Sequence, residues 1–280
     1  MTLHVAPITT ADIPAVARFL HEHLNDRVTA EAWERAVQVP WKVSAPNHGF
    51  LLRDAETGAV AGAYLAFYSE RDGRRFCNLG AWCVLPQHRF HSLKLLKALL
   101  AQEGHIFTDL SPSGNVVPMN TRLGFEFLDT SAVVAPNLPW LPVRGRLSVD
   151  PAVLESTLRG DDLQIYRDHA STAAAQHVLL RRGDRYSYVI YRTDRRKGLP
   201  IFASLLYVSD PELFRVMRRR FQSHLLLRHG ILALLTEIRV AGHRPRLSRM
   251  LPDTRRKMYR GDVAAQDVDY LYSELTCLSW

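Results

Sequence analysis

The segment from Asn78 to Phe125 constrains the fold of this 280-residue chain more than any other. Its mostly apolar start ends at Pro86, which cannot donate a hydrogen bond within a sheet, and this predicts a buried strand over Asn78–Leu85. A second strand is expected over His105–Leu110. Between them, four leucines at helical spacing predict an amphipathic helix that begins near Phe90 and ends at Gly104; they are Leu93, Leu96, Leu99 and Leu100.

The loop Pro86–Lys94 joins this strand to this helix. Free backbone N–H groups at a helix start, together with the helix dipole, suit a phosphate group, and the loop carries fixed positive charge. Two interpretations follow from the residues: a diphosphate cradle with amides open to solvent, or an ordinary turn with solvated basic side chains. The pattern alone favours the turn, because short motifs are weak evidence.

A family resemblance favours the cradle. Val84-Leu85-Pro86 followed by Arg89, Ser92 and Lys94 resembles the acyl-coenzyme A-binding segment of the GNAT (GCN5-related) N-acetyltransferase superfamily, where Val-x-Pro leads into Arg-x-x-Gly-x-Gly/Ala. Arg89 matches that motif, whereas Ser92 and Lys94 stand in place of the two small residues. The resemblance implies that a coenzyme lies along the strand and the loop, on Trp82, Cys83, Val84, Leu85, Gln87, His88, Arg89, Phe90, His91, Ser92 and Lys94.

Two further segments carry the resemblance, in the family's order, over residues 3 to about 130. Arg122–Phe125 is similar to the closing Lys/Arg-Leu-Gly-Phe, and Ile8–Val16 is similar to the opening strand-to-helix segment. One departure concerns the chemistry: the family often has a Tyr as the acid for the leaving thiolate where this chain has Asn120. An amide cannot supply that proton.

The fold class expected is therefore α+β, with a GNAT-like mixed central sheet flanked by helices. The second half repeats the order strand, strand, helix, strand, which predicts two tandem copies. We expect domain boundaries at 1–137 for the acyl-coenzyme A-binding copy, 138–150 for a linker, and 151–280 for a degenerate second copy. That copy has Asp210 and Glu212 where a phosphate would bind, so no coenzyme is expected there.

Five local predictions can be compared with the structure. Phe125–Val134 is expected to be one returning strand, Asp161–Arg182 one long helix, and Ile231–Val240 one strand. Asp194–Gly198 is expected to form a hairpin turn. The apolar C-terminal tail is expected to dock as a final strand or helix.

Acyl transfer from a thioester to an amine requires a polarised carbonyl, a base for the amine and stabilisation of the thiolate. Asp109 is the first candidate for the base, because it ends an apolar strand where burial would raise its pKa. Ser111 and Asn120 are candidates to bind water or thiolate. For all three residues, ordinary loop bonding is the alternative.

Composition adds three expectations. No secretory leader, apolar run of membrane-spanning length or metal-ligand spacing occurs, so we expect a cytoplasmic protein with reduced cysteines and no metal or membrane contact. The net charge of +8 comes mainly from arginines in the second half. Such charge suits nucleic acid or an acidic carrier protein, but no nucleic-acid motif accompanies it, and solvated helix faces explain it equally well.

The function expected is transfer of an acetyl or other acyl group from acetyl-coenzyme A, or another acyl-coenzyme A, to a small-molecule or protein amine. An acyl carrier protein is a further candidate partner. The alternative is a catalytically inactive protein that uses the same fold for binding or as a scaffold. The sequence does not indicate the acceptor or the oligomeric state.

Overall fold

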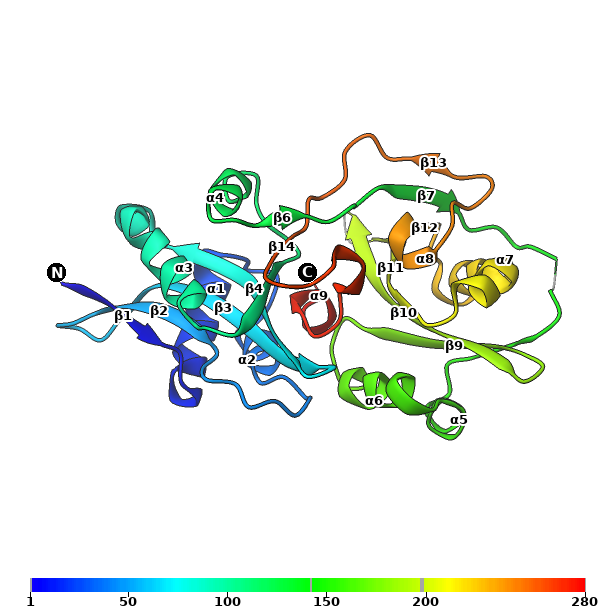
Figure 1. Cartoon of the computed structure of the whole chain (residues 1–280), viewed down its shortest axis with the longest axis horizontal. Helices are drawn as coiled ribbons and strands as arrows, with labels where there is room; N and C mark the ends of the chain where they lie inside the picture. Colours follow the sequence, from blue (N-terminus) through cyan, green and yellow to red (C-terminus); the bar gives the residue numbers. More distant parts are fainter. Residues whose placement is uncertain (1, 142, 197–198, 280) are drawn as a thin grey trace. The chain divides into compact units, whose positions relative to one another are not determined.

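The computed structural model describes residues 2–141, 143–196 and 199–279. The chain forms two compact units (Figure 1). The first unit contains the residues up to Leu128, together with Arg256–Val268 and Tyr272–Leu278. The second unit contains Asp129–Arg255 and Asp269–Leu271. Each unit is built around a seven-stranded mixed sheet with helices against it, as expected for the α+β class.

The sheet of the first unit has the strand order β1-β2-β3-β4-β5-β14-β6. Only the β4–β5 pair is parallel. The strands are β1 (Leu3–Pro7), β2 (Gly49–Asp54), β3 (Val60–Arg71), β4 (Arg74–Val84), β5 (His105–Asp109), β6 (Glu126–Phe127) and β14 (Met258–Arg260). The helices are η1 (Thr10–Asp12), α1 (Ile13–His23), α2 (Ala30–Val37), η2 (Pro86–His91), α3 (Ser92–Leu100), α4 (Val117–Arg122), η3 (Ala265–Asp267) and α9 (Glu274–Cys277).

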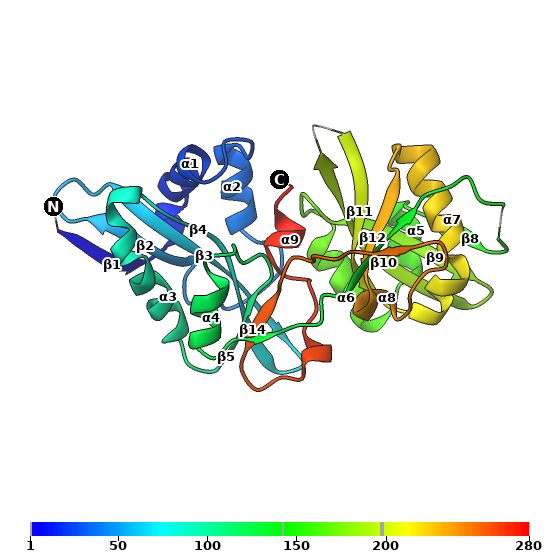
Figure 2. The ribbon, with the colours of Figure 1, turned by 90° about the horizontal axis from the view of Figure 1, so that it is seen from above.

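Helices cover both faces of this first sheet. Figure 2 shows α1 and α2 on one face and α3 and α4 on the other. The predicted leucine stripe of α3 is largely confirmed, since Leu96 and Leu99 are fully buried together with Leu95. They pack with Tyr64 and Phe107 from the sheet. The sheet is therefore packed against helices on both of its faces.

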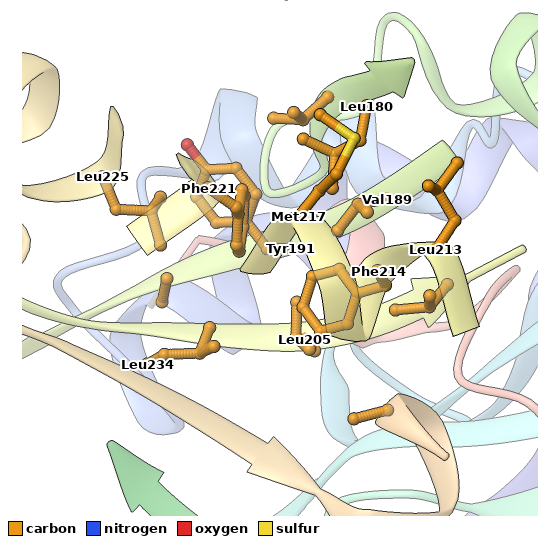
Figure 3. Packing of buried hydrophobic residues seen from close by; sticks show 14 of the residues in the cluster. Leu180, Val189, Tyr191, Leu205, Leu213, Phe214, Met217, Phe221, Leu225 and Leu234 are labelled. Atoms are coloured by element: carbon orange, nitrogen blue, oxygen red, sulfur yellow. The ribbon is translucent and has the colours of Figure 1, made fainter. Parts of the chain in front are cut away.

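The second unit has the strand order β13-β7-β12-β11-β10-β9-β8. Its strands are β7 (Ala132–Pro136), β8 (Arg146–Ser148), β9 (Gln176–Arg182), β10 (Arg185–Arg196), β11 (Leu199–Val208), β12 (Ala233–Glu237) and β13 (Arg249–Met250). Its helices are α5 (Pro151–Thr157), α6 (Gly160–His169), α7 (Pro211–His229) and α8 (Ile238–Ala241). Figure 3 shows the apolar face of α7 against this sheet, with Phe214, Met217 and Phe221 over Val189 and Leu205.

Both units follow one order of elements along their sheets. In each, an antiparallel ladder leads to one parallel pair, β4–β5 in the first unit and β11–β12 in the second. Strand β7 follows β6 in the chain but pairs with β12 in the second sheet. Strand β14 follows β13 in the chain but pairs with β5 in the first sheet. Each sheet thus takes one strand from the other half of the chain, an arrangement compatible with two tandem copies.

The structure divides the chain differently from the predicted ranges 1–137, 138–150 and 151–280. The first unit ends at Leu128, because β7 completes the second sheet. The predicted linker contains β8, which pairs with β9. The C-terminal segment returns to the first unit as β14 and α9. The apolar tail that begins at Tyr270 forms the short helix α9, one of the two forms expected for it.

Three local predictions are wrong. Phe125–Val134 contains parts of two strands, β6 and β7, that belong to different sheets. Asp161–Arg182 divides into α6 and β9, because the apolar run of β9 is short and buried as a central strand rather than as a helix face. Ile231–Val240 ends in α8 after the strand β12. The predicted turn at Asp194–Gly198 is strand up to Arg196, and its last two residues lie outside the described residues.

None of the helices formed by the described residues is both long and apolar enough to cross a membrane.

Candidate functional site

Strand β4 extends beyond its parallel partner. Its register with β5 covers Arg75–Asn78 only, so the stretch Leu79–Val84 has no partner on the β5 side among the described residues. A register shift against β3 leaves Ala81 as an extra residue between Gly80 and Trp82. Ala81 has a φ of 55°, a conformation that residues with a side chain rarely adopt. A bulge and a strained backbone at an unpaired strand end mark a place where a ligand can pair with the chain.

A groove of about 630 Å³ lies at this unpaired end of β4. It is bordered by the end of α1, the start of α3 and the N-terminal end of α4. Four predicted coenzyme-binding residues of β4 and its end line the groove, namely Trp82, Cys83, Val84 and Leu85, and so do Arg89 and Ser92. The remaining lining residues are Glu22, His23, Pro86, Ser113, Asn115, Val116 and Met119.

The predicted phosphate loop is more compact than the sequence suggested. It coils as the 3-10 helix η2, in which the N–H groups of His88 and Ser92 donate to the carbonyls of Leu85 and Arg89. Those two amides are therefore already bonded. Arg89 and Ser92 are the residues of this loop, after Pro86, that reach the groove.

The bulky residues of the loop do not fill the groove. Phe90 is 76 % exposed, and Lys94 is exposed on α3. Neither these two residues nor Gln87, His88 and His91 are among those that line the groove. Phosphate binding by these five residues stays a prediction, and the structure offers Arg89 and Ser92 as its better-placed candidates.

Trp82, which lines the groove, carries a buried polar group. Its ring stacks on Tyr64, with ring centroids 4.5 Å apart and an interplanar angle of 6°. Its indole Nε1 is buried and has no hydrogen-bond partner among the described residues. An indole N–H is only a donor, so this group needs an acceptor oxygen or sulfur from a ligand or water.

Cys83 is not an activated nucleophile. Its Sγ lies 3.5 Å from the carbonyl oxygen of His23, to which the thiol donates. Burial raises the pKa of Cys83, and the charge of Arg89 offsets this only in part. The thiol form therefore dominates at neutral pH, and the residue serves the groove as part of its wall.

Asp109 is a buried carboxyl group at the end of β5. It is 4 % exposed, and one of its oxygens, Oδ2, accepts a hydrogen bond from Asn120 Nδ2 at 2.8 Å. Burial, and then the nearby carboxylate of Glu274, raise the pKa of Asp109 to about 7, against the lowering effect of the bonds from Asn120 and the Ser111 backbone. A carboxylate with this pKa accepts protons at neutral pH.

Glu274 brings a second buried carboxylate to the same strand ends. It is fully buried, and Ser111 Oγ donates to its Oε1 at 2.6 Å. Asn78 Nδ2 donates to its Oε2, and Thr108 Oγ1 donates to Asn78 Oδ1 at 3.0 Å. Asn78 and Thr108 are register partners in the β4–β5 pair, so these bonds join Glu274 to the last paired rung of the sheet.

The two carboxylates approach the strand ends from opposite faces. Asp109 bonds to α4, which lies on the face of α3, whereas α9, which carries Glu274, contacts β4 and α2. Gly80 makes room for this approach, because a Cβ there would lie 3.2 Å from Glu274 Cβ and 3.1 Å from Phe67 Cε2. Because Gly80 has no side chain, α9 can lie against β4 at the bulge.

The tail that carries Glu274 is held firmly in the first unit. Ser273 caps α9 by accepting a bond from the Leu275 amide. The Tyr272 ring packs edge-on against Trp41, with ring centroids 5.1 Å apart, and the Arg71 guanidinium lies over the Tyr272 ring at 5.1 Å. Trp41 in turn donates Nε1 to the carbonyl of Tyr68 at 2.8 Å. Glu274 is therefore held in position by the contacts of its sequence neighbours, Tyr272, Ser273 and Leu275.

The predicted catalytic residues Asp109, Ser111 and Asn120 form one cluster, through bonds to each other and to Glu274. None of the three is among the residues that line the groove. Asn120 is fully buried, and its Oδ1 has no partner among the described residues. Glu274 was not predicted, because 163 residues separate it from Ser111. The one available signal was a carboxylate within an otherwise apolar tail.

Comparison with known proteins bears on the fold of the chain. No protein-family model and no curated protein sequence matches the chain. Solved structures do. A GCN5-related N-acetyltransferase from Anabaena variabilis matches with a TM-score of 0.58 at 13% identity, covering 92% of this chain and 72% of that one.

Two further structures match over the same share of this chain. A GCN5-related N-acetyltransferase from Kribbella flavida gives a TM-score of 0.54 at 16% identity and is covered to 72%. A GCN5-related glucosamine N-acetyltransferase region of a fungal multi-domain β-N-acetylglucosaminidase matches with a TM-score of 0.60 at 12% identity. The match covers 92% of this chain and 38% of that one. The chain therefore has the fold of the GCN5-related N-acetyltransferases, as predicted.

Proposed function

We propose that this protein transfers an acyl group from an acyl-coenzyme A to an amine, and that the first unit carries the site. The observation that supports this most is the unpaired end of β4 beside a groove and a buried carboxylate pair. Open backbone groups on Leu79–Val84 provide hydrogen bonds for an extended, amide-containing arm. Arg89 and Ser92 line the same groove and provide a charge and a hydroxyl for a diphosphate.

The Asp109–Glu274 pair acts as the proton acceptor in this proposal. An ammonium group must lose a proton before its nitrogen attacks a thioester carbonyl, and a base with a pKa near 7 accepts that proton efficiently. The nitrogen then forms the amide bond while the carbon–sulfur bond breaks, so the leaving thiolate carries the displaced electron pair. Asp109 keeps the first proton, taken from the ammonium group, until solvent removes it. The nitrogen releases a second proton as the amide forms, and water carries that proton to the thiolate.

In this proposal, a hydrogen-bond donor rather than a tyrosine acid stabilises the leaving thiolate. Asn120 cannot release a proton, and its Nδ2 already donates to Asp109. The indole N–H of Trp82 is buried at the groove without a partner among the described residues, so it is free to donate to the thiolate or to the carbonyl oxygen. Protonation of the thiolate is then left to water.

The activity is tested by thiol release. The full chain is incubated with acetyl-coenzyme A and a panel of amines, including amino sugars, polyamines and lysine peptides, and free thiol is followed with a chromogenic disulfide. We expect release that depends on both the protein and an amine, with the acylated amine found by mass spectrometry. Coenzyme binding without release for every amine would favour the catalytically inactive alternative.

Replacing Arg89 by Met is expected to weaken coenzyme A binding roughly tenfold or more, since a hydrogen bond to a charged group contributes on the order of 1.5–3 kcal/mol. Calorimetric titration with coenzyme A measures the dissociation constant directly. Lys97→Met is the matched control, because it removes the same charge from the exposed side of α3, away from the groove. Equal weakening in both variants would assign the effect to net charge and would count against Arg89 as a ligand.

A further inference from the structure

Arg218 is a buried cation with no carboxylate partner among the residues that the structure describes. It lies on α7 in the second unit and is 9 % exposed. Its Nη1 donates to Gln222 Oε1 at 3.1 Å, and its Nε is buried without a partner in the described part of the chain. Burial of a guanidinium costs free energy unless hydrogen bonds and an opposite charge compensate it, so an anion is expected to bind here.

The charges around Arg218 have the same sign. Burial, and then the neighbouring Arg219, lower the pKa of Arg218. After burial and a bond that opposes it, the positive charges of Arg218 and Arg215 lower the pKa of His243. These like charges raise the local potential, and they favour any anion that reaches the guanidinium.

His243 provides a hydrogen-bond acceptor, in addition to the donor Nε–H of Arg218. Its Nδ1 lies 2.8 Å from the carbonyl oxygen of Ala241, which can only accept, so Nδ1 carries the proton. The other ring nitrogen, Nε2, is therefore a lone-pair acceptor in the neutral ring. It is buried and has no partner among the described residues. Gly242, with a φ of 69°, ends α8 just before this residue. The His243 ring lies near α7, with its centroid 6.2 Å from that of Phe214, which is one helical turn before Arg218.

The Arg218 side chain is held in place rather than free to turn into solvent. Gln222, one turn further along α7, accepts from Arg218 through Oε1 and donates through Nε2 to the carbonyl of Pro136 at 3.0 Å. Gln222 is 1 % exposed. The Gln222 amide thus fixes the orientation of the Arg218 guanidinium.

We propose that Arg218 and His243 form a phosphate-binding site between α7 and the segment that follows α8. A phosphate group has oxygens that accept from Arg218 Nε–H and, in its singly protonated form, a hydroxyl that donates to His243 Nε2. A carboxylate at neutral pH offers acceptors only, and would leave the histidine nitrogen unpaired. The site lies in the second unit and is distinct from the groove of the first.

The test is thermal unfolding of the full chain in sodium phosphate and in sodium chloride of equal ionic strength, with calorimetric titration of phosphate as the direct measurement. We expect phosphate to raise the Tm of the wild type, as a ligand of the folded state must. In Arg218→Met the rise is lost, and phosphate affinity falls roughly tenfold or more. Phosphoserine in place of inorganic phosphate shows whether the group is recognised free or as part of a larger molecule.

Three variants make the outcome decisive. Arg228→Met removes the same charge from an exposed position on the same helix and should keep the rise. Arg89→Met should also keep it, which separates this site from the groove. His243→Gln, offered in case Arg218→Met fails to fold, should reduce it. The proposal is overturned if the wild type shows no phosphate-dependent rise, or if the rise survives in both Arg218→Met and His243→Gln.

Discussion

Asp109→Asn is expected to make the protein more stable at pH 8 and to reduce acyl transfer about 100-fold or more. The folded state raises the pKa of Asp109 from 3.8 to about 7, so it binds this proton more tightly than the unfolded chain does. The contribution of this carboxyl to stability is therefore complete below pH 4 and is lost as the pH rises through 7. Above that pH the folded state holds a buried carboxylate.

The amide introduced by Asp109→Asn would remove that cost while keeping an oxygen for the bond from Asn120 Nδ2. Three pKa units correspond to about 4 kcal/mol, so we expect a gain of about 2–4 kcal/mol at pH 8 and almost none at pH 4. Urea unfolding at both pH values measures the difference. The rate should fall because a general base contributes about 10²–10⁴-fold.

Asp262→Asn is the matched control for this variant, since the side chain is exposed in the same unit. It should change neither the rate nor the pH dependence of stability. A loss of stability in Asp109→Asn at pH 8 would show that Asp109 is an ordinary ionised turn residue. An unchanged rate would remove it from the proton path.

Glu274→Gln is expected to move the pH–rate profile to lower pH. The Glu274 carboxylate is the second cause of the raised pKa of Asp109, so its neutralisation lowers that pKa and lets the base ionise in more acidic solution. The amide still offers an oxygen to Asn78 and an N–H that Ser111 Oγ can accept. We therefore expect the fold to persist, with the midpoint of kcat/KM against pH below that of the wild type.

Glu274→Ala separates this electrostatic effect from packing. It leaves a buried donor, Asn78 Nδ2, and a half-buried donor, Ser111 Oγ, without their acceptor, at about 1–3 kcal/mol for the buried one and less for the other. Urea unfolding should show a loss of about 2–5 kcal/mol, much larger than the loss in Glu274→Gln. If the pH midpoint stays unchanged in Glu274→Gln, the two carboxylates do not act as a pair, and the proposed proton acceptor reduces to Asp109 alone.

The sequence predicted the core of the first unit because local signals were sufficient there. Pro86 ends the pairing of β4, and the leucine spacing of α3 defines its buried face. The family resemblance, rather than these signals, made Arg89 and Ser92 candidates for coenzyme binding, and both line the groove. The order of β1 to β5 follows from these elements and from the turns between them, with Gly73 in the β3–β4 turn at a φ of 69°.

What could not be predicted depends on contacts between distant parts of the chain. Periodicity indicates a strand in the region of β7, but it carries no information about which of two similar sheets the strand joins. The three residues of β14 are too few to show a period, and no strand was predicted there. Short apolar runs also fit both helix and strand, as β9 shows. Glu274 reaches Asn78 and Ser111 only because the tail returns to the first unit.

A crystal structure of the full chain with bound coenzyme A tests the central claim most directly. We predict that the pantetheine arm lies along the unpaired stretch Leu79–Val84, bonded to its backbone, with the diphosphate at Arg89 and Ser92 and the thiol end near Trp82. Coenzyme bound elsewhere on the molecule, or a groove that stays without coenzyme at millimolar concentrations, would contradict the account.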